Sequence, residues 1–196
     1  NTQEVIQVAA ETILQMSEGE IIQMENARRM HLTEKDYFDV ISQKTACLLA
    51  NCAKIGAASV GATPEQKDAL YHYGKHLGIA FQLKDDILDY ESNQQGKPIG
   101  NDLQERKLTL PLLYALEHAP LHEKLRIRLQ VRMCERHPEF IPQIQKWVRH
   151  AGGVEYTRKM IQKHGQFAES ALDIFPDSEV KQSLLLLIDY LADRKN

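Results

Sequence analysis

The first third of the chain contains no proline, and this feature most restricts what the chain can fold into. No proline occurs between Asn1 and Ala62, glycine is sparse there, and apolar residues recur with the spacing of one helix face. No segment shows the apolar–polar alternation of a half-buried strand. Prolines and the Gly152–Gly153 pair divide the remainder into further helices. The sequence therefore predicts a single all-α domain over residues 1–196.

Start and stop signals define the expected helices. Thr33 with Asp36 three residues later, and Thr63 followed by Pro64, are typical helix starts. Small residues between 53 and 59 would let another helix approach closely. The expected helices cover residues 4–25, 33–60, 63–91, 109–118, 120–136, 138–150, 154–174 and 178–194, with a polar loop at 92–108.

Charge and composition exclude some classes of function. With 24 basic and 27 acidic residues the net charge is -3, which gives no electrostatic reason to expect a nucleic-acid partner. No apolar run is long enough to cross a bilayer. Cys47, Cys52 and Cys134 form no CxxC pair, so they are predicted to be buried, reduced thiols of a cytoplasmic protein.

Three aspartates stand inside an apolar helical run near the middle of the chain. Asp85, Asp86 and Asp89 surround the apolar pair Ile87 and Leu88. Their spacing lets all three lean to one side of a helix, where like charges repel one another. Isolated carboxylates are costly to bury unless a cation meets them. Either solvent or a metal ion must therefore face this cluster.

The helix that precedes the cluster brings other polar groups to nearly the same height. A short connection makes the helices at 33–60 and 63–91 antiparallel neighbours. Lys44 lies about 27 Å from the turn and Gln82 about 28 Å, at a rise of about 1.5 Å per residue. Asp85 lies about 33 Å from it on the same count. Lys44 and Thr45 are therefore expected level with Gln82 and about one turn short of Asp85.

Carboxylate oxygens favour a hard cation. Mg²⁺ is typically held by one or two carboxylates, several waters and a phosphate-bearing substrate. Lys44, Lys97 and Lys107 are suited to the phosphate oxygens of such a substrate. The alternative is a solvated acidic edge at a helix end. The apolar surroundings and the level of Lys44, Thr45 and Gln82 favour the metal–diphosphate interpretation.

At these residues the sequence resembles the trans-isoprenyl diphosphate synthases, or polyprenyl synthetases. The resemblance extends from one end of the chain to the other and implies an isoprenoid-synthase-type helical bundle. Arg106 departs from the family pattern, in which many members have glycine. The motifs that carry it are SEGE with Gln23, KTA (44–46), FQLKDDILDY (81–90), GKPIGNDLQERKLTLP (96–111) and the ending DYLADRKN.

The resemblance implies a role for each matching residue. Asp85, Asp86 and Asp89 would bind Mg²⁺, with Asp102 supporting the metal or its waters. The groups that would hold the allylic diphosphate or flank its reacting carbon are Lys44, Thr45, Gln82, Lys97 and Lys107, with Gln23 and Arg194 as candidate pocket-lining residues. The implied reaction is head-to-tail condensation of an allylic prenyl diphosphate with isopentenyl diphosphate, which releases diphosphate. The implied assembly is a homodimer.

One family feature has no counterpart in the chain. The first aspartate-rich motif of the family, which would hold further Mg²⁺ on an opposing wall, is not found in residues 1–80. The chain therefore resembles the C-terminal part of a synthase, and we expect it to have little or no synthase activity on its own.

Two other classes of protein stay open at the level of sequence. One is a non-catalytic small subunit of a heteromeric synthase, against which the intact aspartate motif argues. The other is a class I terpene cyclase-like protein, which the KTA and GKPIGNDL segments fit less well. His72 and His76 are spaced as a metal pair. Without a third ligand nearby they are interpreted as surface or packing histidines.

Overall fold

The computed structural model describes residues 2–29, 32–91 and 100–193, and within them every regular element is a helix. The expectation of an all-α protein is therefore confirmed. In the same residues, no helix combines the length and the apolar character needed to cross a membrane. The elements are α1 (Thr2–Arg29), α2 (Glu34–Ile41), the π-helical turn η1 (Ser42–Ala46), α3 (Cys47–Ser59), α4 (Pro64–Leu88), α5 (Asn101–Gln104), α6 (Leu110–His118), α7 (Leu121–Met133), the 3-10 turn η2 (Pro138–Phe140), α8 (Ile141–His150), α9 (Gly153–Ala171) and α10 (Glu179–Asp193).

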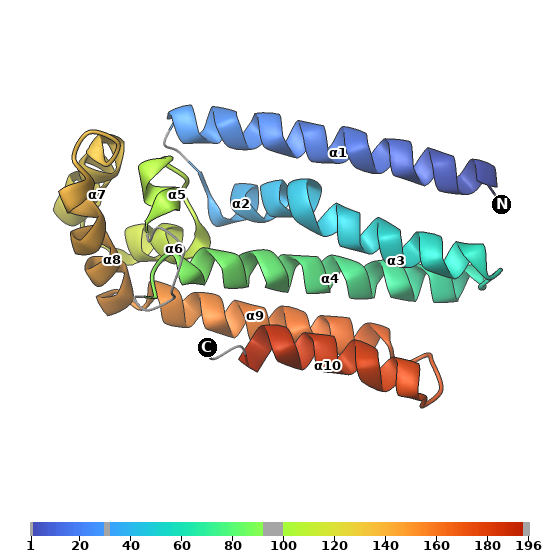
Figure 1. Ribbon diagram of the computed structural model, residues 1–196. Coiled ribbons are helices and arrows are strands. Elements are labelled where there is room, and N and C mark those ends of the chain that lie inside the picture. The colour runs from blue at the N-terminus through green and yellow to red at the C-terminus, as the bar shows by residue number, and fades with distance from the viewer. Residues whose placement is uncertain (1, 30–31, 92–99, 194–196) are drawn as a thin grey trace.

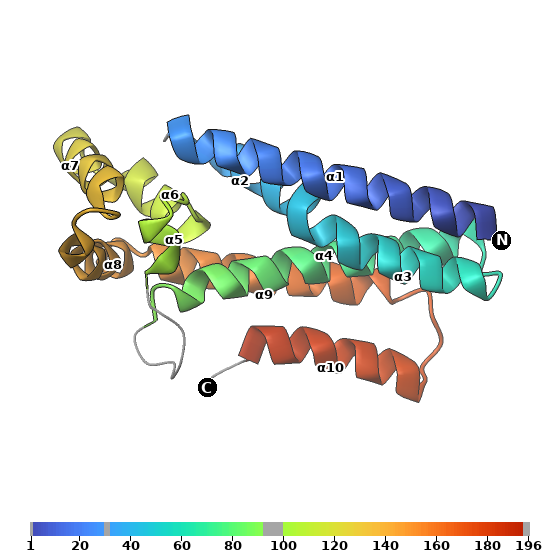
Figure 2. The ribbon, with the colours of Figure 1, turned by 45° about the horizontal axis from the view of Figure 1, so that its top comes forward.

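Helix α4 is the centre of the bundle. It packs along α3 on one side and along α9 on the other, while α1 covers α3 and η1, and α10 covers α9. Figures 1 and 2 show these long helices side by side, with α5 to α8 gathered at the end where α4 finishes. The segments that carry the candidate residues therefore meet at one end of an elongated bundle.

The helix starts agree with the sequence. Thr33 and Asp36 form a capping box, and Thr63 forms another with Gln66 ahead of Pro64 at the first turn. The continuous helix expected over 33–60 is confirmed from Glu34 to Ser59, but it is not α-helical throughout, because the π-helical turn η1 stands between α2 and α3. A wide turn of this kind shifts residues around the helix axis without changing local propensity, so apolar spacing does not reveal it. A further short helix, α5, lies inside the expected 92–108 loop.

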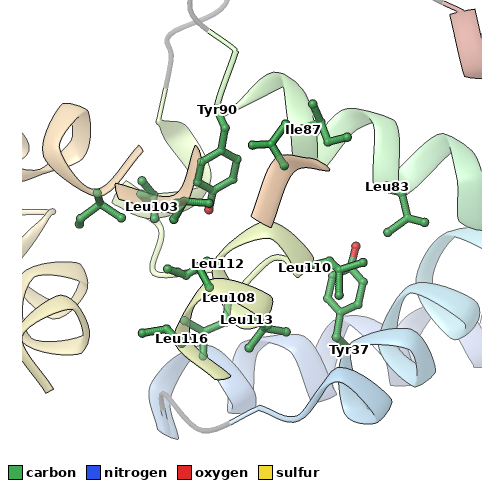
Figure 3. Packing of buried hydrophobic residues seen from close by; sticks show 14 of the residues in the cluster. Tyr37, Leu83, Ile87, Tyr90, Leu103, Leu108, Leu110, Leu112, Leu113 and Leu116 are labelled. Carbon is green, nitrogen blue, oxygen red and sulfur yellow. The ribbon is translucent and has the colours of Figure 1, made fainter. Parts of the chain in front are cut away.

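The main core lies where α4 meets α6. Figure 3 shows Leu83, Ile87 and Tyr90 of the α4 segment facing Leu110 and Leu112 of α6, and none of these five side chains is more than 1% exposed. Their burial holds the C-terminal end of α4 in one orientation. That end carries the aspartates, so the core positions the acidic cluster.

The cysteine prediction holds for two of the three thiols. Cys47 and Cys134 are buried, whereas Cys52 is exposed on α3. A helix face that is rich in small residues gives little indication of which side meets water, and this is why the sequence misplaced Cys52.

Close approach of α3 and α4 depends on glycines of α4. A Cβ atom at Gly74 would come within 2.5 Å of the Leu49 carbonyl oxygen, and one at Gly78 within 2.7 Å of Ala46 Cα. On α3, by contrast, a Cβ at Gly56 would meet nothing within 4 Å. Within the small-residue stretch at 53–59, Ala57 is therefore buried, whereas Gly56 is exposed and takes no part in a close contact.

Two histidines join α4 to α9 inside the bundle. The Nδ1 atoms of His76 and His164 lie 3.0 Å apart, and Phe38 stacks on the His164 ring. Burial lowers the pKa of each imidazole to about 4, and neighbouring positive charge, from Lys75 for His76 and from Lys163 for His164, acts in the same direction. The interpretation of His76 as a packing residue is thus supported. Groups of three or more His, Cys, Asp or Glu side chains that could hold a metal ion are absent from the described part of the chain.

Acidification is expected to weaken the α4–α9 contact. The unfolded imidazoles take up protons near their ordinary pKa of 6.5, but the folded ones do so only near 4. The unfolded state thus binds more protons between these two pKa values. The stabilisation that the neutral His76–His164 pair provides is therefore complete above about pH 6.5 and is lost as the pH falls. We expect the free energy of unfolding to drop by about 1–2 kcal/mol through this pair between about pH 7.5 and pH 5, after allowance for solvent screening.

Urea unfolding of the wild type and of a His76→Gln, His164→Gln double variant at both pH values measures this contribution. The double variant should lose less stability on acidification than the wild type. His122→Gln, which alters an exposed histidine of α7, should leave the wild-type pH dependence unchanged. Equal losses in the wild type and the double variant would contradict the expectation.

Candidate functional site

A cavity of about 210 Å³ lies at the end of the bundle where α1, α2, η1 and α4 meet the 100–109 segment. Its walls are apolar toward α2 and polar toward α4. Seven of the nine site residues expected from the sequence line it. They are Lys44, Thr45, Gln82, Asp85, Asp86, Asp102 and Lys107, and the pocket-lining candidate Gln23 lines it as well. Lys97 and Arg194 lie outside the described residues.

A chain of hydrogen bonds runs along one wall of the cavity. The Tyr37 hydroxyl donates to Asp86 Oδ2, and Gln82 Nε2 donates to Asp86 Oδ1 over 2.9 Å. Thr45 Oγ1 donates in turn to Gln82 Oε1 over 3.0 Å. The expected level of Thr45 and Gln82 is therefore confirmed by a direct contact. Asp86 is only 3% exposed and faces into this network rather than into solvent.

Lys44 is held by side chains of α1. Its ammonium nitrogen lies 2.5 Å from Glu20 Oε2 and donates to Gln23 Oε1 over 2.9 Å. Helix α1 reaches this position because Gly19 has no Cβ, and one built there would lie 2.8 Å from the Lys44 backbone nitrogen. The π-helical turn and Gly19 together fix where the Lys44 charge sits at the cavity wall.

Asp89 does not share the cavity-facing side of Asp85 and Asp86. It caps the C-terminal end of α4, where its Oδ1 accepts the backbone N–H groups of Gly100 and Asn101 at 2.9 and 3.0 Å. Its Oδ2 is buried, and no donor in the described residues reaches it. The expectation that all three aspartates lean to one side is therefore not met.

The segment after α5 adds a cation beside the acidic groups. Lys107 lies 3.3 Å from Asp102 Oδ1 and 2.7 Å from Glu105 Oε2. Burial alone would lower the pKa of the Lys107 ammonium, but its hydrogen bond to Glu105 and the charge of Asp102 raise that pKa above its usual value. Lys107 is therefore charged and already paired where the cavity opens.

Burial and mutual repulsion disfavour the ionised forms of the carboxylates in this region. Burial raises the pKa of Asp86 to about 7, against the lowering effect of the hydrogen bonds from Tyr37 and Gln82. Burial, then repulsion from Asp102, raises the pKa of Asp89 to about 6. Burial also raises the pKa of Asp102. A cation placed among these groups would offset both the desolvation and the mutual repulsion.

The residues present fit Mg²⁺. Their donors are carboxylate oxygens, the ligands this ion prefers, and the buried oxygen of Asp89 without a hydrogen-bond donor is an acceptor in need of a partner. Asp85 and Asp102 line the cavity within reach of solvent or of a bound phosphate. Mg²⁺ takes few protein ligands and keeps its waters, so it does not require a closed group of three carboxylates.

Sequence reasoning missed Tyr37 and Glu20. Tyr37 lies four residues before Ile41 and eight before Thr45, a spacing that would place all three on one face of a regular α-helix. That spacing could have revealed it as a neighbour of the site. Glu20 belongs to the SEGE segment, and its contact with Lys44 depends on how closely α1 approaches.

The fold and the cavity together define a helical-bundle protein with acidic and basic groups on one cavity wall. The polyprenyl synthetase family model matches residues 1–146. The chain therefore belongs to the polyprenyl synthetase family.

The relatives and solved structures agree with this assignment. The octaprenyl diphosphate synthase of Escherichia coli (strain K12) is 35% identical over 193 residues, which are 97% of this chain and 59% of that protein. A geranylgeranyl pyrophosphate synthase structure from Bacteroides thetaiotaomicron superposes with a TM-score of 0.90 at 36% identity, over 98% of this chain and 64% of that one. The polyprenyl synthase of Caulobacter crescentus was solved with calcium and isoprenyl diphosphate. It superposes with a TM-score of 0.89 at 29% identity, over 98% of this chain and 60% of that one. The chain thus spans about three-fifths of the length of the curated relatives that it matches.

Proposed function

We propose that this chain supplies one wall of a Mg²⁺-dependent site for prenyl-chain elongation. The reaction is the head-to-tail condensation of an allylic prenyl diphosphate with isopentenyl diphosphate. The observation that carries the proposal is the grouping of Asp85, Asp86 and Asp102 with Lys44 and Lys107 around one cavity. Anionic groups for a metal and cationic groups for phosphate at one place fit a metal-bound diphosphate better than either a bare cation or a bare anion.

The residues of the chain have distinct tasks in this reaction. Asp85 and Asp102 hold the metal, with Asp89 at the buried edge of the same acidic cluster. Bound Mg²⁺ supplies charge that stabilises the departing diphosphate. Lys44 and Lys107 bind diphosphate oxygens and exchange their present carboxylate partners for phosphate, and Lys97 is proposed to join them.

Thr45 and Gln82 act on the hydrocarbon side of the reacting bond. Both line the cavity, and their oxygens carry the negative ends of fixed dipoles. Such dipoles favour the positive charge that develops on the allylic carbon as the C–O bond breaks. The apolar wall formed by Leu32, Val40 and Ile41 keeps water away from that carbon.

The relatives support the substrate class and the metal. The Caulobacter crescentus protein was solved with calcium and isoprenyl diphosphate, a divalent cation and a ligand of the proposed kind. A homodimeric assembly and a cytoplasmic location are part of the same proposal. The exposed apolar side chains of α1, among them Ile6, Ile13 and Ile21 at 64–66% exposure, support an assembly in which this helix is covered.

Isothermal titration calorimetry of the chain with inorganic pyrophosphate tests the proposed site directly. In the presence of Mg²⁺ we expect saturable binding, and with EDTA in place of Mg²⁺ we expect no heat beyond dilution, because the carboxylates would repel a bare anion. Product formation from labelled isopentenyl diphosphate and an allylic diphosphate is measured in parallel, and we expect little or none from this chain on its own. If pyrophosphate does not bind even in the presence of Mg²⁺, the proposal is wrong.

A further inference from the structure

The Tyr37 hydroxyl joins a residue of the core to a carboxylate of the candidate site. Tyr37 is 4% exposed, it lies on α2, and its hydroxyl reaches across to Asp86 on α4. Figure 3 shows its oxygen directed toward the helix that carries Leu83 and Ile87. A buried tyrosine places its hydroxyl where a partner exists, and here that partner is the most enclosed carboxylate of the candidate site.

Each hydrogen bond in this chain has a defined donor and acceptor, and each one constrains the next. Asp86 accepts at both of its oxygens, from the Tyr37 hydroxyl at Oδ2 and from Gln82 Nε2 at Oδ1. Gln82 therefore turns its NH₂ group toward Asp86 and its carbonyl oxygen away from it. That carbonyl oxygen accepts a hydrogen bond from the Thr45 hydroxyl, and the lone pairs of the Thr45 oxygen accept none from the described residues.

From this geometry we propose that Tyr37 is a positioning residue which fixes the orientation of the Gln82 amide. The hydroxyl occupies Asp86 Oδ2 and so presents Asp86 Oδ1 to Gln82 Nε2. With the amide held this way, Gln82 and Thr45 both offer oxygens rather than N–H groups at the cavity wall. A rotated amide would point two partial positive hydrogens at the place where positive charge develops. The role in turnover rests on the proposed function, whereas the orientation of the amide does not.

Tyr37→Phe removes the donor and keeps the ring. Without it, Asp86 loses one of its two fixed donors and can rotate, so the Gln82 amide is released from a single orientation. Tyr73→Phe is the matched control, because Tyr73 of α4 is also 4% exposed and its hydroxyl donates to the Leu184 carbonyl of α10, outside this network. Both variants delete one buried hydroxyl, but only one of the two hydroxyls touches the network.

The experiment follows the side-chain NH₂ signals of Gln82 by NMR on the ¹⁵N-labelled chain, with Gln82→Ala to assign them. We expect hydrogen exchange of these protons to be about tenfold faster in Tyr37→Phe, as for loss of a hydrogen bond to a charged group, and unchanged in Tyr73→Phe. Thermal unfolding of both variants reports the general effect of losing a buried hydroxyl. Gln82 signals that are identical in the wild type and in folded Tyr37→Phe would overturn the proposal.

Two further measurements separate this proposal from the proposed function. Affinity of the chain for pyrophosphate with Mg²⁺ should stay within about twofold in Tyr37→Phe, because the Tyr37 hydroxyl is bonded to Asp86. Turnover is measured on the chain joined to a segment that carries the family's first aspartate-rich motif, and there kcat for condensation should fall by about tenfold at unchanged KM. A wild-type chain that binds no pyrophosphate refutes the diphosphate site but leaves the Gln82 signals to decide the role of Tyr37. Equal kcat in wild type and Tyr37→Phe would refute the part of Tyr37 in turnover.

Discussion

Replacing Gly74 by alanine is expected to lower the free energy of unfolding by about 2–3 kcal/mol, which corresponds to a fall in Tm of about 5–10 °C. The added Cβ would lie 2.5 Å from the Leu49 carbonyl oxygen and 2.8 Å from Ala50 Cα. Both neighbours are backbone atoms inside a helix, so neither can swing aside as a side chain would. The helices α3 and α4 must then separate, and this outweighs the gain of about 1 kcal/mol from the better helix propensity of alanine.

Gly56→Ala provides the opposite case on the facing helix. Gly56 is helical and exposed, and a Cβ there meets nothing within 4 Å. Only the propensity term remains, so this variant should be more stable than the wild type by about 0.5–1 kcal/mol. Thermal and urea unfolding measure both changes. If Gly74→Ala proves neutral or stabilising, the two helices do not pack as closely as described.

Removing the Asp85 charge is expected to weaken binding of pyrophosphate in the presence of Mg²⁺ by about 10–100-fold, the range seen when groups that support a metal site are lost. Asparagine in place of Asp85 keeps the shape and removes the charge at a group that is exposed at the cavity wall. Fold stability should change little, since Asp85 is not part of the core. Calorimetry with Mg²⁺ and pyrophosphate measures the loss of affinity.

Asp68→Asn is the matched control for Asp85→Asn. It removes the same charge from the same helix at another exposed position. The two residues are about 26 Å apart along α4, well beyond the screening length of about 8 Å at physiological salt. Asp68→Asn should therefore bind as the wild type does. Equal loss in both variants would show that α4 attracts Mg²⁺ through general charge and that no specific site exists.

The sequence by itself determined the helices and the groups that gather at one end of them. Apolar periodicity, the Thr33 and Thr63 caps and the prolines act within a few residues, so they are readable without tertiary structure. The level of Thr45 and Gln82 was also predictable, because a short connection and a constant rise fix relative heights on neighbouring helices. The contact of 3.0 Å between them confirms that arithmetic.

The direction of each side chain within that end of the bundle was decided only by the tertiary structure. Asp86 and Asp89 stand only three residues apart, yet one faces Tyr37 and Gln82 and the other faces the backbone at 100–101. Lys44 faces Glu20 because Gly19 admits α1 closely. These outcomes depend on helix rotation, on the π-helical turn and on contacts between residues far apart in sequence, such as Tyr37 and Asp86. No local pattern encodes such contacts, because the partner comes into reach only when the helices pack.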